Sequence, residues 1–147
     1  MLRGILLGLR PLFLLRQSMR IANANVVIPD HPVMKYAQTV AEKIWIANGR
    51  PEGITITAGK NGVHGPGSWH NYGAAVDLRT HYDDRQIYDN GAMADYPADS
   101  LNWDDLDRTD VLAELKDALP EYDIIMHSTH IHCEPGDVLA RKWGLLL

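Results

Sequence analysis

The stretch that organises this chain is Ser68-Trp-His-Asn-Tyr-Gly-Ala-Ala-Val-Asp77. It sets His70 and Asp77 seven positions apart, with a glycine and two alanines between them. The end of the stretch is small and apolar apart from the aspartate, which predicts the start of a strand. Successive strand side chains alternate between faces, so Asp77 is expected to point away from the face that carries Val76 and Leu78.

A second segment, His127-Ser-Thr-His-Ile-His-Cys-Glu134, holds three histidines and a carboxylate within eight residues. If Ser128-Thr129 forms a two-residue hairpin turn, all three histidines and Glu134 share one face. Ile131 and Cys133 would then face the core. Four titratable groups on one face are costly to leave unpaired, so this face is predicted to be a site or to be open to solvent.

Together the two segments offer one aspartate and several histidines to a single site. Imidazole nitrogens and a carboxylate oxygen are the ligands of catalytic zinc centres, which keep a fourth position for water. We therefore expect one zinc ion as the cofactor.

Composition limits the other possibilities. The chain has 147 residues, a formal net charge of -5 and 46% hydrophobic residues, which indicates one globular domain without the bulk basic field that recruits nucleic acid or anionic lipid. Its single cysteine, Cys133, excludes an intrachain disulfide and a structural zinc site built on several cysteines. We expect a monomer.

Residues 1–24 are expected to form an N-terminal extension or a signal-like segment, and residues 25–147 a single catalytic domain that holds the zinc site. The apolar runs before residue 20 are interrupted by Arg10 and are too short for a stable membrane span. Arg16 and Arg20 lie where signal peptides are usually uncharged. The protein would be periplasmic or extracellular if this segment is a signal, and otherwise cytoplasmic with release at lysis.

Hydrophobic periodicity predicts a small α+β domain. We expect a central, mainly antiparallel sheet with helices on one side and zinc at the floor of a cleft. The expected helices cover residues 32–47, with Asp30 as the N-cap, then 109–119 and 137–147. The expected strands cover residues 54–58, 74–79, 122–126 and 130–134. Long loops are expected at 59–67 and 81–107.

Ser68-x-His70-x-x-Gly73-x-Ala75-x-Asp77 resembles the S-x-H-x-x-G-x-A-x-D motif of the M15 zinc peptidases, the D-alanyl-D-alanine carboxypeptidase and dipeptidase group. His130-x-His132 resembles the H-x-H motif of the wider superfamily that also holds lysostaphin-type endopeptidases and the hedgehog signalling domain. The resemblance spans residues 54–134 and implies a hedgehog/D-Ala-D-Ala peptidase-like fold.

The resemblance implies that zinc is bound by His70, Asp77 and His132, and that the substrates are peptidoglycan stem peptides. His130 would line the site as a general base or transition-state stabiliser. Glu134 has three interpretations: a base, a partner that orients a ligand histidine, or an ordinary charge at the end of a strand.

Other candidates are His127, as a second catalytic histidine, and Ser68, Lys60 and Arg79 as substrate-binding residues. Ser68 could equally hold the His70 loop in place. Two departures from the family pattern stand out. Where many M15 members carry a glutamate base, this chain has Thr129 and His130. Where a T-S-G-Y-R segment supplies an arginine, Thr57-Ala-Gly-Lys60 offers a lysine.

Two alternatives remain open. The first is a non-catalytic zinc-binding interaction domain of hedgehog-like architecture. The second is a zinc hydrolase that acts on a different bond, such as an ester.

Overall fold

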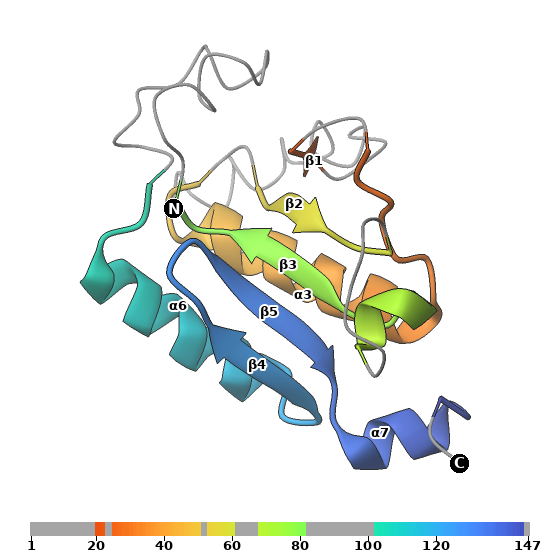
Figure 1. Cartoon of the computed structure of the whole chain (residues 1–147). Helices are drawn as coiled ribbons and strands as arrows, with labels where there is room; N and C mark the ends of the chain where they lie inside the picture. The colour runs from red at the N-terminus through yellow and green to blue at the C-terminus, as the bar shows by residue number, and fades with distance from the viewer. Residues whose placement is uncertain (1–19, 23–24, 51–52, 61–67, 82–101, 146–147) are drawn as a thin grey trace, which may run out of the picture.

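A five-stranded sheet in the order β1-β2-β3-β5-β4 forms the centre of the computed structural model (Figure 1), which describes residues 20–22, 25–50, 53–60, 68–81 and 102–145. The strands are β1 (Arg20–Ile21), β2 (Thr55–Ala58), β3 (Val76–Arg79), β4 (Tyr122–Met126) and β5 (His130–Pro135). The helices are α3 (Pro32–Ala47), the short 3-10 helix η1 (Trp69–Tyr72), α6 (Asp105–Ala118) and α7 (Asp137–Lys142).

The predicted α+β class is confirmed, but the expectation of a mainly antiparallel sheet has to be corrected to a mixed sheet. β1 pairs with β2 in parallel, with Arg20 opposite Thr55, while the pairs β2·β3, β3·β5 and β4·β5 are antiparallel. The parallel pair is possible because α3 lies between β1 and β2 in the chain and provides the crossover that parallel strands need.

The core lies on the face of the sheet that α3 and α6 cover. Val76 and Leu78 of β3 and Ile131 and Cys133 of β5 are almost completely buried there. The predicted alternation is therefore confirmed in both strands, and Asp77 and His132 point to the opposite face. From here on that opposite face is called the site face.

The predicted cap of α3 and the predicted start of α6 were wrong, whereas α3 begins at Pro32 as expected. His31, not Asp30, caps α3: its Nδ1 accepts a hydrogen bond from the backbone N–H of Val33 at 3.1 Å. α6 begins at Asp105 rather than at 109, because the Asp104 carboxylate accepts from the backbone N–H of Asp107 at 2.8 Å and so provides an earlier cap.

Of the helix ends, that of α3 matches the expectation and that of the last helix does not. α3 ends as predicted at Asn48-Gly49, where Gly49 has a φ of 81°. The last helix, α7, is shorter than the expected 137–147 and ends at Lys142.

No helix in the described part of the chain is both long and apolar enough to cross a membrane. Most of the expected N-terminal segment 1–24 and of the loops 59–67 and 81–107 lies outside the described residues.

Burial of Cys133 predicts a pH effect on stability. Burial raises the pKa of its thiol to about 12, whereas the pKa of a cysteine in an unfolded chain is about 8.5. The folded state therefore holds a proton that the unfolded state releases, so this contribution to stability is complete below pH 8.5 and is lost as the pH rises toward 12. Between these two pKa values the free energy of unfolding should fall by up to about 1.4 kcal/mol per pH unit.

Urea unfolding of chelator-treated protein at pH 8, 9 and 10 would measure this slope, with Cys133→Ala as the comparison. The variant should lack the cysteine contribution while it keeps any slope due to Tyr122, whose pKa burial also raises. Equal slopes in the two proteins would contradict the prediction.

Candidate metal centre

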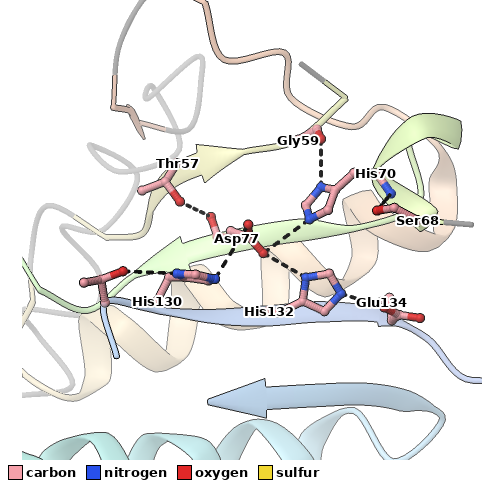
Figure 2. Close-up of polar contacts among 9 residues, drawn as sticks. Thr57, Gly59, Ser68, His70, Asp77, His130, His132 and Glu134 are labelled. Atoms are coloured by element: carbon pink, nitrogen blue, oxygen red, sulfur yellow. Dashed lines mark hydrogen bonds and ion pairs between the residues drawn. The ribbon is translucent and has the colours of Figure 1, made fainter. Parts of the chain in front are cut away.

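Three separate pieces of the chain bring a histidine, an aspartate and a second histidine together on the site face (Figure 2). The antiparallel register of β3 and β5 sets Asp77 opposite His132 and Arg79 opposite His130. His70 comes from η1, which precedes β3.

Local sequence positions His70 at the start of β3. The Ser68 side chain caps η1 by accepting a hydrogen bond from the backbone N–H of His70 at 3.3 Å. Gly73 ends η1 with a φ of 68°, a left-handed conformation that favours glycine. The fixed serine and glycine of the motif therefore build the turn that presents His70. The structure gives Ser68 a role in holding this loop, and its predicted contact with substrate stays a prediction.

The orientation of the His70 ring is fixed by a backbone carbonyl. His70 is 5% exposed, and its Nδ1 lies 2.8 Å from the carbonyl oxygen of Gly59. A carbonyl only accepts, so Nδ1 carries the proton and donates, and the lone pair is left on Nε2. Nε2 lies 3.4 Å from Oδ1 of Asp77.

Residue 59 has to be a glycine for a packing reason. A Cβ at this position would lie 2.0 Å from the carbonyl oxygen of Val27. The close approach of the two backbones places the Gly59 carbonyl beside His70. Sequence reasoning missed this contact, because a backbone acceptor leaves no signal in the residue type of its partner.

His132 is held between two carboxylates. Its Nδ1 lies 2.8 Å from Oδ1 of Asp77, and its Nε2 lies 2.6 Å from Oε1 of Glu134. Nε2 donates to Glu134, so Nδ1 is the nitrogen that faces Asp77 and His70. Among the three interpretations of Glu134, this geometry favours the partner that orients a ligand histidine.

The charges of the site depend on one another. Burial alone would raise the pKa of Asp77, but the neighbouring imidazoles of His132 and His70 outweigh it and hold that pKa far below its ordinary value. Burial lowers the pKa of His132, yet hydrogen bonds to Asp77 and Glu134 more than compensate and the pKa of this imidazole is raised. Asp77 is therefore an anion at neutral pH, as a metal ligand must be.

The arrangement fits a divalent metal ion. The three ligand atoms, one each from His70, Asp77 and His132, all lie within 4.8 Å of one another. Zinc–nitrogen and zinc–oxygen bonds of about 2.0–2.1 Å in a tetrahedron require ligand atoms roughly 3.3 Å apart. The separations from Asp77 Oδ1 to the two imidazole nitrogens, 3.4 Å and 2.8 Å, are close to that value. The structure therefore brings the three predicted ligands together into a group that could hold a metal ion.

The remaining histidines lie beside this group. His130 approaches the second oxygen of Asp77, with Nε2 3.8 Å from Oδ2, and its Nδ1 lies 3.2 Å from the Thr129 hydroxyl. His127 stacks on His130 with ring centroids 4.7 Å apart. Burial lowers the pKa of His130, and the neighbouring histidines lower it further against the opposing effect of Asp77. His130 is thus neutral at pH 7 and can accept a proton.

The two predicted cationic substrate-binding residues lie at different places. Arg79 is opposite His130 in the β3·β5 register, two residues from Asp77 and on the same side of the strand. Lys60 is exposed and follows Gly59, and its side chain runs close to Gly73. Their contacts with substrate stay predictions. His64, four residues before Ser68 in the sequence, lies outside the described residues.

Comparisons with protein-family models, with curated protein sequences and with solved structures found no match to this chain.

Glu134→Gln should weaken zinc binding by about 10–100-fold, which is typical when a partner that orients a ligand histidine is lost. The amide keeps the size of the side chain but lacks the carboxylate charge that accepts the Nε2 proton of His132. Competition titration against a fluorescent zinc chelator would measure the change. Glu121→Gln, at the foot of the same hairpin, serves as the control and should bind zinc as the wild type does. An unchanged affinity in Glu134→Gln would show that the 2.6 Å contact does not orient the ligand.

Proposed function

We propose that this protein is a zinc-dependent peptidase that hydrolyses peptide bonds in peptidoglycan stem peptides. One observation carries the metal-binding part: two imidazoles converge on the same oxygen of Asp77, and the other nitrogen of each ring is held by an oxygen acceptor. This arrangement fixes which nitrogen faces the ion, as in metal centres whose ligand histidines are oriented by outer partners.

The substrate class is supported by the motifs in the sequence. The serine, histidine, glycine and aspartate of the first motif each have a structural role that a zinc site requires, since Ser68 and Gly73 form the turn and His70 and Asp77 provide ligand atoms. His130-x-His132 supplies the third ligand and a neighbouring base. The resemblance to M15 peptidases and to their hedgehog/D-Ala-D-Ala peptidase-like fold is part of this proposal.

When bound, zinc acts as a Lewis acid toward a peptide carbonyl and lowers the pKa of water toward about 7. The residues of the chain then have distinct tasks. His130 is neutral, lies beside the second carboxylate oxygen of Asp77 and would accept the proton that the nucleophile releases. Glu134 orients His132, and His127 stacks on His130 and limits its rotation.

Digestion of purified muropeptides followed by mass spectrometry tests the proposal. The zinc-loaded protein should release products with a new amine, and activity should be lost on chelation and in His132→Ala. His31→Ser is the matched control, because it also removes a histidine but replaces it with a residue that can cap α3. Circular dichroism should confirm that both variants are folded.

A zinc-loaded wild-type protein that leaves every muropeptide intact would contradict the proposal. If this protein also hydrolyses no ester, the non-catalytic zinc-binding interaction domain is favoured. Cleavage of esters alone would indicate a hydrolase of a different bond.

A further inference from the structure

An exposed aliphatic side chain lies next to the metal centre. In the β4·β5 register Ile125 is directly opposite His132, so the two side chains share the site face and are neighbours across the strands. Ile125 is 49% exposed, whereas the preceding Ile124 is 5% exposed and belongs to the core. Ile125 is therefore not a core residue of β4.

The surroundings of Ile125 on the site face are polar. Two positions before and after it along the chain lie Asp123 of β4 and His127, which follows the strand, and across on β5 lie His132 and Glu134. A large aliphatic side chain among four titratable groups adds nothing to the hydrophobic core and gains little from its neighbours. Ligand sites commonly combine apolar walls with a few polar groups that fix orientation, and Ile125 would supply such a wall.

The surface continues as a hollow beyond Ile125. A cavity of about 460 Å³ lies between the C-terminal end of α6 and the outer edge of β4, and its lining includes Lys116, Leu119, Tyr122 and Ile125. In the sheet order β4 is an outermost strand among the described residues. Among the residues that line this hollow, Ile125 is the one directly opposite the predicted ligand His132.

This geometry points to Ile125 as a specificity-determining residue, an inference that rests on the proposed peptidase function. We propose that Ile125 contacts an apolar side chain on the substrate residue next to the scissile bond, and that the substrate crosses β5 and β4 toward the hollow. Neighbouring strands are about 4.8 Å apart and an extended peptide advances about 3.3 Å per residue, so one to two residues cover the step from His132 to Ile125.

A panel of stem peptides tests this inference. Each alanine of the stem is replaced in turn by glycine, leucine or glutamate, and kcat/KM is measured for the zinc-loaded wild type, Ile125→Ala and Ile125→Lys. At one position the wild type should favour leucine or alanine over glutamate. Ile125→Ala should reduce this preference by about tenfold or more, since methylene contacts are worth about 10–200-fold in selectivity. Ile125→Lys should shift the preference toward glutamate.

Leu106→Ala is the matched control, because Leu106 is a 69% exposed aliphatic residue on α6. It should keep the wild-type order of preference, and all variants should bind zinc equally. If Ile125→Ala and Ile125→Lys also keep that order while the wild type cleaves peptides, the inference is wrong and the proposed function stands.

An NMR measurement that does not depend on turnover distinguishes a failure of this inference from a failure of the proposed function. With isoleucine methyl groups labelled for NMR, adding the alanine stem peptide to the zinc-loaded protein should shift the Ile125 resonance. If no peptide is cleaved, the proposed function fails, and an unshifted Ile125 methyl group would then overturn this inference as well.

Discussion

Asp77→Asn is expected to abolish tight zinc binding and, with it, hydrolysis of stem peptides. Asp77 Oδ1 is the atom on which both ligand imidazoles converge, and its carboxylate is an anion at neutral pH. Asparagine keeps the size of the side chain but offers a neutral oxygen. Loss of an outer partner of a ligand costs about 10–100-fold in affinity, so loss of a charged ligand should exceed about 100-fold.

Thermal unfolding with and without zinc gives a measurement that does not depend on activity. Zinc at about 100 times its dissociation constant should stabilise the wild type by about 2.7 kcal/mol, and the same zinc concentration should leave Asp77→Asn nearly unchanged. Asp123→Asn is the control, since Asp123 is an exposed aspartate on β4, which β5 separates from the strand that carries Asp77. Equal stabilisation of Asp77→Asn and the wild type by zinc would rule out the proposed ligand set.

Trp45→Ala should destabilise the fold by about 3–5 kcal/mol, the usual range for removal of a large buried aromatic residue. Trp45 is 1% exposed and packs edge-on against Trp103, with ring centroids 5.3 Å apart. Arg50 lies over the Trp103 ring at 4.0 Å, so the pair joins the end of α3 to the segment that leads into α6. Alanine would leave a cavity at this junction.

Urea unfolding followed by circular dichroism would measure this loss. Tyr36→Ala is the control on the same helix, because Tyr36 is 58% exposed and its removal should cost less than about 1 kcal/mol. If the two variants lost similar stability, the buried Trp45–Trp103 contact could not be a main support of the core.

The site was largely predictable because it depends on strand periodicity. Asp77, His130, His132 and Glu134 lie on local pieces of strand whose alternation is readable, and the two-residue turn fixed His127 opposite His130. The pairing of β3 with β5 was not readable in the same way, because no local pattern states which strand lies next to which. The two motifs suggested it only by offering ligands to the same ion.

Other features depended on tertiary contacts that composition does not encode. The parallel pairing of β1 with β2 depends on the crossover through α3, which lies between the two strands in the sequence. The two residues of β1 alone do not predict it. The cap of α3 is His31 rather than the predicted Asp30, because an imidazole nitrogen can also accept a hydrogen bond from the helix N-terminus. Residue preferences for the N-cap position favour aspartate over histidine and so pointed to Asp30. The Gly59 carbonyl beside His70 depends on the approach of Val27 from another part of the chain.

Asp77 and His132 lie 55 positions apart in the sequence, and yet they share a hydrogen bond. An ion gripping them works as a reversible cross-link around the intervening chain, which includes α6 and β4. Such a link reduces the conformational entropy of the unfolded chain. The resulting stabilisation grows with the logarithm of the number of residues in the closed loop. Metal supply would then govern how long the folded molecule survives, apart from any reaction it carries out.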